Sequence, residues 1–145
     1  MATIYFDMDG TIADLYGVEN WLEMLINHIA TPYEVARPLL RLSALARVLN
    51  GLQKRGYRIG IISWLSKNST TEYDEQVTQA KLTWLSIHLA SVQFDEINIV
   101  SHGTPKEQFA TNENDILFDD EEKNRESWTG RAFDATEIME TLKAL

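Results

Sequence analysis

The chain has 145 residues and no cysteine, and its 13 Lys and Arg against 22 Asp and Glu give a formal net charge of -9 at pH 7. This length suits a single domain, and the lack of cysteine excludes a disulfide framework, a thiolate zinc site and a cysteine nucleophile. The negative charge argues against a nucleic-acid backbone as the main partner. No window approaches the ~18 apolar residues of a membrane span and no signal sequence is apparent, so we expect a cytoplasmic protein without a membrane partner.

The first half of the chain is predicted to form two buried strands separated by helices. Residues 3–7 are a short apolar run typical of a buried strand. Residues 17–30 carry apolar side chains at helical spacing, until a Thr-Pro pair interrupts the pattern. A second helix is expected over residues 39–55, where two basic residues and a glycine close it. Residues 57–63 are then predicted to form the second strand.

The second half is predicted to continue the alternation of helices and strands. In chain order we expect a helix over 73–90, a strand over 97–100, a short helix over 105–109, a strand over 115–119, a short strand over 131–133 and a terminal helix over 136–145. Either Asp134 or Thr136 would cap the last helix. Apolar strands that alternate with helices and lack a period of two are typical of a parallel sheet. We therefore predict an α/β fold with helices on both faces of a parallel sheet.

Polar side chains follow three of these predicted strands. Asp7 and Asp9 come after the first strand, Ser63 after the second, and Asp119 and Asp120 after the fourth. Ligands of parallel sheets bind at the carboxyl ends of the strands, so these residues should be neighbours in space. Two carboxylates so close to each other repel unless a cation holds them. Oxygen ligands without cysteine suit Mg²⁺, and a partly hydrated Mg²⁺ commonly takes phosphate as a further ligand.

The sequence FDMDGTIAD, which spans Asp7 and Asp9, resembles the first motif of the haloacid dehalogenase-like (HAD) phosphatase superfamily. Ser63 matches the Ser or Thr of the second motif, Lys106 the lysine of the third, and Asp119-Asp120 the paired acids of the fourth. The resemblance covers the whole chain, from residue 4 to the terminal helix. It implies a HAD-like Rossmannoid fold and an Mg²⁺-dependent phosphatase.

The resemblance also implies roles for individual residues. Asp7 would be the nucleophile that forms an aspartyl-phosphate, and Asp9 would protonate the leaving oxygen and later deprotonate water. Ser63 and the backbone N–H groups after it, beginning with that of Trp64, would bind phosphate oxygens. Lys106 would offset the charge between Asp7 and the phosphoryl group. The ring of Trp64 is also a candidate to lie against a substrate base or sugar.

The expected Mg²⁺ ligands come from the same two acidic motifs. Asp7 and Asp9 can both approach one ion, one through a carboxylate oxygen and the other through its backbone carbonyl. Asp120 aligns with the usual direct ligand of the family, because Asp119 stands where many members have Gly. Asp119 would then bind the metal through water.

The segment between the first two strands is too short for a large cap. We predict one domain over residues 1–145, with a small helical cap insertion at about 14–38. A small cap leaves the site open, which suits a macromolecular phosphate or a substrate enclosed by a second copy in an oligomer. Short-capped members include 5'(3')-deoxyribonucleotidase-like enzymes, so the expected substrate is a nucleotide monophosphate or another small phosphate ester.

Other interpretations of the same residues stay open at this stage. The acids could belong to a receiver-like signalling domain, although such a domain needs its acceptor Asp after the third strand, where this chain has Val100-Ser101-His102. The chain could also be a catalytically idle phosphate-binding module. Lys106 could be a surface lysine, and Asp119 and Asp120 could simply cap the helix that follows them.

Overall fold

The computed structural model describes residues 2–145, which form a five-stranded parallel sheet and a separate two-stranded ribbon. The strands of the sheet are β1 Thr3–Phe6, β4 Arg58–Trp64, β5 Glu96–Val100, β6 Ile116–Phe118 and β7 Arg131–Phe133. They lie in the order β5-β4-β1-β6-β7, and every neighbouring pair is parallel. The predicted α/β fold class is confirmed, and each strand expected from the sequence is present to within two residues at its ends.

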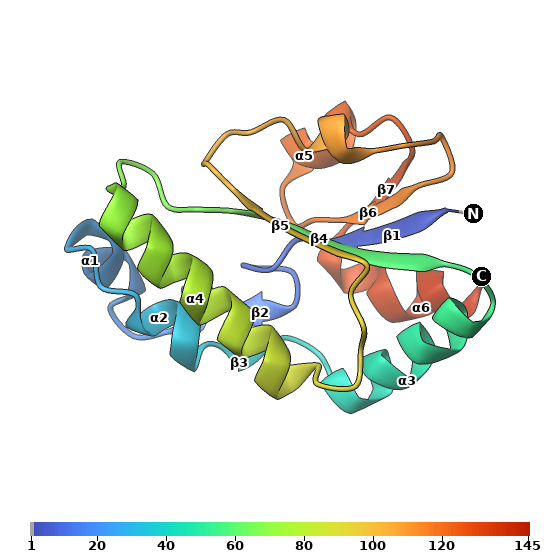
Figure 1. Ribbon diagram of the computed structural model, residues 1–145, viewed down its shortest axis with the longest axis horizontal. Coiled ribbons are helices and arrows are strands. Elements are labelled where there is room, and N and C mark those ends of the chain that lie inside the picture. Colours follow the sequence, from blue (N-terminus) through green and yellow to red (C-terminus); the bar gives the residue numbers. More distant parts are fainter. Residues whose placement is uncertain (1) are drawn as a thin grey trace.

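Helices cover both faces of the sheet (Figure 1). Helices α3 (Leu42–Lys54), α4 (Thr71–His88) and α6 (Ile138–Lys143) pack on one face, where the largest apolar cluster contains Ile4 and Phe6 of β1. The 3-10 helix η2 (Lys106–Phe109) and helix α5 (Glu122–Ser127) cover the other face. A smaller cluster there contains Tyr5, Ile62, Leu117 and Trp128. Alternate side chains of β1 thus point to opposite faces of the sheet, as the pleat of a strand requires.

The order of the strands reverses direction at β1. From β1 the chain moves to β4 and then β5 on one side, and it returns to place β6 and β7 on the other. Such a reversal opens a crevice beyond the carboxyl ends of the two central strands, here β1 and β6. Asp7 follows β1 and Asp119 follows β6, so the fold brings the two acidic motifs together at this crevice.

A small insertion separates β1 from α3. Strands β2 (Ala13–Asp14) and β3 (Arg37–Pro38) pair antiparallel at its base, and between them lie η1 (Leu15–Gly17), α1 (Trp21–Ile26) and α2 (Thr31–Val35). We propose that this segment is the cap predicted at about 14–38. Helix α1 buries none of its residues, and Leu22 and Ile26 are more than half exposed.

The prediction of one helix over residues 17–30 is wrong. Helix α1 spans only Trp21–Ile26, because Asn20 and His28 adopt left-handed backbone conformations with φ of 61° and 55° on either side of it. The Thr-Pro pair that interrupts this spacing also begins α2, since Pro is well suited to the first turn of a helix.

The other helices follow the sequence closely. Helix α3 begins at Leu42 rather than at residue 39, because Arg37 and Pro38 are held in β3. The terminal helix is preceded by a 3-10 turn, η3 (Ala135–Glu137), and Asp134 caps that turn in a capping box with Glu137. Asp134 thus caps the turn that leads into the terminal helix, whereas α6 (Ile138–Lys143) itself has Glu137 at its N-cap and no side-chain cap. In residues 2–145 no helix combines the length and apolar character needed to cross a membrane.

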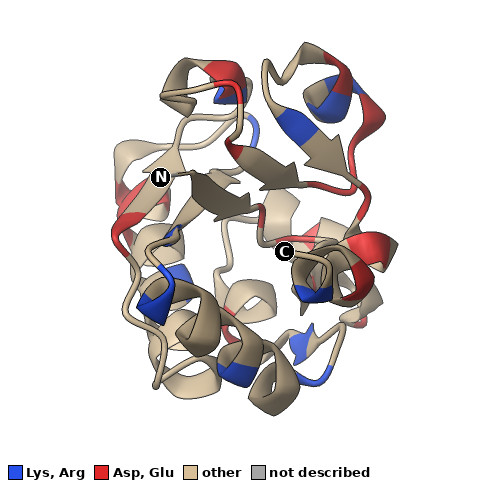
Figure 2. Ribbon diagram, turned by 90° about the vertical axis from the view of Figure 1, so that its right-hand side faces the viewer, with Lys and Arg blue, Asp and Glu red and all other residues tan. Residues whose placement is uncertain are grey.

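Basic and acidic residues are interspersed on the elements around the sheet (Figure 2). Half of the ion pairs among the described residues are partly exposed, such as the contacts of Arg58 with Asp95 and Glu96 at 3.9 Å. Two buried lysines, Lys81 and Lys106, are exceptions and both pair with acids that follow β1 or β6.

Candidate active site

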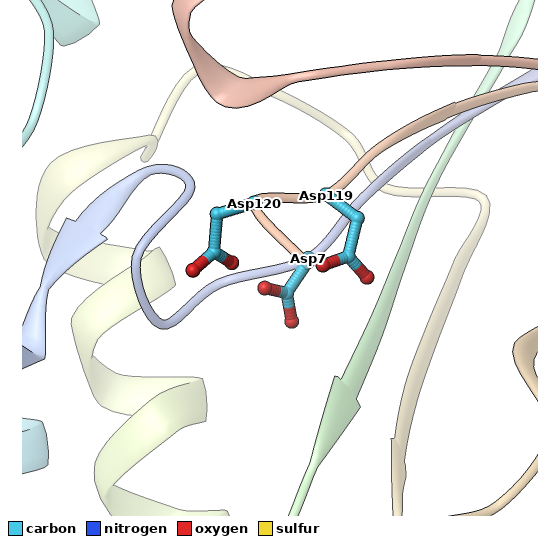
Figure 3. Close-up of side chains that lie close together, drawn as sticks. All are labelled: Asp7, Asp119 and Asp120. Carbon is cyan, nitrogen blue, oxygen red and sulfur yellow. The ribbon is translucent and has the colours of Figure 1, made fainter. Parts of the chain in front are cut away.

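Three carboxylates meet where β1 and β6 end. Asp7, Asp119 and Asp120 each place one carboxylate oxygen within 4.8 Å of the others, and Figure 3 shows the three side chains converging from the two strand ends. Asp7 and Asp119 are buried, and Asp120 is half-buried. Hard oxygen donors at this spacing form a set that can hold one divalent cation such as Mg²⁺.

Gly10 and Thr11 bring the turn after β1 into contact with Asp120. Gly10 has φ of +82°, and a Cβ atom at that position would overlap the Asp120 carboxylate, so a side chain there would displace a member of the cluster. The Thr11 hydroxyl lies 3.1 Å from Asp7 Oδ2 and 3.2 Å from Asp120 Oδ1. It also accepts a hydrogen bond from the Asp120 backbone N–H at 3.2 Å. Thr11 therefore bridges the two acidic motifs.

Lys106 supplies a positive charge to the cluster. Its Nζ donates to Asp7 Oδ1 at 3.0 Å and to Asp119 Oδ2 at 2.7 Å, and its side chain is 2% exposed. Burial lowers the pKa of Lys106, but Asp7 and Asp119 outweigh burial and the pKa is raised overall. Lys106 is a buried, charged member of the cluster and not a surface lysine.

The two acids after β6 are held differently. Asp119 Oδ2 accepts from Lys106 and from Asn124 Nδ2, and Asp119 Oδ1 accepts from the Glu121 backbone N–H at 2.9 Å. Asp120 Oδ2 receives no hydrogen bond from the described residues, whereas its Oδ1 contacts Thr11. Asp120 thus has the more available oxygen for a metal ion, and Asp119 is largely occupied by the protein.

Burial and repulsion between like charges raise the pKa values of the acidic side chains at this site. Desolvation, reinforced by the charge of Asp7, raises the pKa of Asp119 from 3.8 to about 6 and that of Asp120 to about 7. Burial also raises the pKa of Asp9, although the Lys81 ammonium opposes the shift. Extra negative charge at such a site is unfavourable without a cation, which agrees with the donor set for a divalent metal.

Asp9 lies beside this cluster but its carboxylate faces a different lysine. Lys81, on α4, donates from Nζ to Asp9 Oδ2 at 2.9 Å, to Ser63 Oγ at 2.6 Å and to the Trp64 backbone carbonyl at 2.7 Å. The carboxylate of Asp9 is not part of the three-acid group. A metal contact through its backbone carbonyl stays a prediction.

Ser63 and Trp64 end β4 on the other side of the crevice. Ser63 is fully buried, and Lys81 already contacts its hydroxyl oxygen, so only the hydroxyl proton is left for a phosphate. Of the backbone N–H groups expected to bind phosphate, that of Leu65 donates to Val100 O at 2.7 Å. Phosphate binding by Ser63 and by the Trp64 N–H stays a prediction.

The indole of Trp64 forms part of the wall around Lys106. Its Nε1 donates to Thr104 O at 2.8 Å, its ring centroid lies 4.9 Å from that of His102, and Lys106 Nζ lies 5.3 Å from the ring centroid. These contacts fix the ring at the carboxyl end of β4. Beside it, a polar hollow of about 370 Å³ is lined by residues that follow β4 and β5, among them Lys67 and His102.

Two members of the site escaped the sequence analysis. Thr11 lies within the first motif, and the signal for its role is its position next to Gly10 after a strand. Lys81 carried a different signal, because it stands among Val77, Ala80 and Trp84 on the buried face of a predicted helix. A lysine on such a face needs an acidic partner, and the sequence does not say which acid supplies it.

Comparison with known proteins finds similarity of structure but none of sequence. No family model and no curated relative matches the sequence. The structure is similar to a D,D-heptose 1,7-bisphosphate phosphatase from Burkholderia thailandensis, with a TM-score of 0.53 and 15% identity over 88% of this chain and 71% of that one. It is also similar to a chain of a Pnkp1/Rnl/Hen1 complex, with a TM-score of 0.57 and 15% identity over 93% of this chain and 45% of that one.

These similarities show that the chain has the α/β fold of HAD-like phosphatases. The chain spans less than half of its counterpart in the Pnkp1/Rnl/Hen1 complex, so that larger protein contains parts with no equivalent here.

Proposed function

We propose that this protein is an Mg²⁺-dependent phosphomonoester hydrolase that works through an aspartyl-phosphate on Asp7. The observation that carries the proposal is the meeting of Asp7 with Lys106, Asp119 and Asp120 at the crevice between β1 and β6. A nucleophilic carboxylate, a neutralising cation and a metal-ligand set are the parts that phosphoryl transfer requires. The fold shared with HAD-like phosphatases supports the same reaction class.

The reaction divides between Asp7 and Asp9. An Asp7 oxygen attacks phosphorus, the bond to the ester oxygen breaks, and Asp9 gives its proton to that oxygen, so an alcohol leaves. Water then attacks the phosphorus of the aspartyl-phosphate, Asp9 takes the water proton, and inorganic phosphate leaves as the Asp7 carboxylate is restored. The raised pKa of Asp9 favours the protonated form that the first step needs.

The residues present fit a bound Mg²⁺. Asp7 and Asp120 would hold it directly, Asp119 through water, and the backbone carbonyl of Asp9 is a further candidate ligand. When bound, the ion would neutralise charge on the phosphoryl oxygens. Lys106 would hold Asp7 in place and reduce its repulsion of the incoming phosphate.

For the substrate we propose a small phosphate ester, with a nucleotide monophosphate as the leading candidate. A polar hollow lies beyond the ends of β4 and β5, and the Trp64 ring, which packs against His102 of its lining, is the candidate to stack on a base or sugar. The similar heptose bisphosphate phosphatase makes a sugar phosphate the next compound to test.

A receiver-like signalling domain is the main competing function, and the strand order counts against it. Numbered along the chain, the sheet strands lie in the order 3-2-1-4-5, whereas receivers have the order 2-1-3-4-5. The third strand of the sheet, β5, ends in Val100 and is followed by no acid at the acceptor position.

The proposal is tested by replacing Asp7→Asn and measuring phosphate release from p-nitrophenyl phosphate and from nucleoside monophosphates with Mg²⁺. We expect turnover to fall by about 10³-fold or more, because an amide is a poor nucleophile. Glu140→Gln, at an exposed acid on α6, is the matched control and should keep wild-type turnover. Unchanged turnover in the Asp7 variant would reject the proposal.

A further inference from the structure

Lys81 is the more deeply buried of the two lysines near the site and has no role in the mechanism above. Its side chain is 1% exposed, and it comes from the middle of α4, far along the chain from the acidic motifs. An ammonium group has three N–H donors, and each has a partner: Asp9 Oδ2, Ser63 Oγ and Trp64 O. No N–H is left to bind a substrate.

The two buried lysines divide the acids of the site between them. Lys106 contacts Asp7 and Asp119 and has one donor left over, which the proposed mechanism assigns to a phosphoryl oxygen. Lys81 contacts Asp9 alone among the acids. Its three short contacts join the turn after β1, the end of β4 and helix α4 into one unit around the Asp9 carboxylate.

A purely structural role explains this lysine poorly. Its neighbours on the buried face of α4 are apolar, and burying a charged pair there is no more stabilising than filling the space with an apolar side chain. Tyr33 of the insertion places its ring 5.1 Å from Lys81 Nζ, and its hydroxyl lies 2.5 Å from Ser66 Oγ. Lys81 Nζ thus also packs against an aromatic ring of the insertion.

We propose that Lys81 is a positioning residue that fixes the Asp9 carboxyl for proton transfer to the leaving group. With Oδ2 held by Lys81, Asp9 Oδ1 has no partner among the described residues and is the oxygen free to face the ester oxygen. Because Lys81 is a donor only, Ser63 Oγ accepts from it and keeps its own hydroxyl proton for donation. This inference rests on the proposed phosphatase activity.

The test compares two esters of similar size that differ in leaving group. p-Nitrophenol leaves readily and needs little proton transfer, whereas phenol leaves poorly and needs a well-placed acid. We expect Lys81→Met to lower kcat/KM for phenyl phosphate by about tenfold or more relative to its effect on p-nitrophenyl phosphate. Lys54→Met, on the exposed side of α3, is the control and should change neither value.

A double-mutant cycle with Asp9→Asn separates positioning from folding. If Lys81 acts through Asp9, adding Lys81→Met to Asp9→Asn should change kcat/KM by less than about twofold. The double variant removes both members of the Lys81–Asp9 ion pair, so neither charge is left buried without a partner. If Lys81→Met alone fails to fold, the double variant is compared with Asp9→Asn alone.

Two results would overturn the inference. One is an equal loss of kcat/KM for both esters in a folded Lys81→Met enzyme. The other is a loss of kcat/KM in the double variant equal to the product of the losses in the two single variants. Failure of the proposed function looks different: the wild-type protein would then hydrolyse neither ester.

Discussion

Lys106 donates a hydrogen bond from Nζ to Oδ1 of Asp7 over 3.0 Å, although 99 positions separate the two residues in the chain. The contact places a buried cation against the proposed nucleophile. We expect Lys106→Met to lower turnover by about 10²-fold or more, because the negative charges of Asp7 and an incoming phosphate would repel each other. Steady-state hydrolysis of p-nitrophenyl phosphate measures the effect.

The same variant should also lose stability, since Asp7 and Asp119 would be left buried without their shared partner. Activity is therefore compared at a temperature where circular dichroism shows the variant folded. Full turnover in the folded variant would contradict the role given to Lys106.

Asp120 and Asp119 should differ in their contributions to Mg²⁺ binding. Asp120 Oδ2 takes no hydrogen bond from the described residues, whereas both Asp119 oxygens accept hydrogen bonds from the protein. We expect Asp120→Asn to weaken Mg²⁺ binding by about tenfold or more and Asp119→Asn to weaken it less. Titration calorimetry with MgCl₂ measures both, and a larger loss in the Asp119 variant would show that the assignment of the direct ligand is reversed.

The raised pKa values of Asp119 and Asp120 predict how stability depends on pH. Folding raises these pKa values from 3.8 to about 6 and about 7, so between these limits the folded protein holds more protons than the unfolded chain. The free energy of unfolding of the metal-free protein should therefore fall as pH rises from about 4 to about 7.

Mg²⁺ should offset this loss, because it binds the ionised acids of the folded state. Urea unfolding at several pH values, with EDTA and with MgCl₂, measures the effect. We expect stabilisation by Mg²⁺ to be greater at pH 7.5 than at pH 5. Equal stabilisation at both pH values would count against metal binding by this cluster.

Gly10 and Gly103 form a matched pair for testing the turn after β1. Both have positive φ, of 82° and 86°, but a Cβ at Gly10 would overlap the Asp120 carboxylate, whereas one at Gly103 would meet open space. Each Gly→Ala variant should lose about 1 kcal/mol of unfolding free energy from backbone strain. Only Gly10→Ala should also weaken Mg²⁺ binding, and equal binding in the two variants would contradict the contact with Asp120.

The sheet and the acidic cluster were predictable because local signals specify them. An apolar run without a period of two indicates a buried parallel strand, and Asp7 and Asp119 each follow such a run directly. Once the strands are placed, the rule that ligands bind at carboxyl ends brings these acids together without further information. Lys106 was found only through its place in a family motif, because a lysine in a loop carries no local signal of burial.

The insertion and Lys81 were harder because they depend on tertiary contacts. The apolar spacing over residues 17–30 suggests one helix, but Asn20 and His28 take left-handed conformations that no sequence pattern requires. Lys81 stands at a position that periodicity assigns to the core, and only the fold shows that Asp9 and Ser63 lie within its reach. The residue pattern of one element does not show which distant element it will contact in the fold.

Asp115 lies at the start of β6, and we expect it to contribute to folding and not to catalysis. It is fully buried at the start of β6, the opposite end from Asp119. Its Oδ1 accepts from the Thr3 backbone N–H at 2.8 Å, and its Oδ2 accepts from the backbone N–H groups of Thr111 and Asn112 at 2.7 and 3.2 Å. The carboxylate thus joins the start of β1 to the loop before β6.

Replacing Asp115→Asn keeps the size of the side chain but turns one acceptor into a donor, which would face N–H groups that also donate. We expect a loss of about 2–4 kcal/mol in the free energy of unfolding, because buried donors lose their partner.

Asp95→Asn is the matched control. Asp95 Oδ2 accepts from the Ile59 N–H at 2.8 Å, but its side chain is 32% exposed, so water can replace the contact and the loss should be smaller. Urea unfolding measures both, and hydrolysis of p-nitrophenyl phosphate well below the unfolding transition should stay near the wild-type value. A folded Asp115 variant without activity would place this acid in the active site and contradict the separation of the two ends of β6.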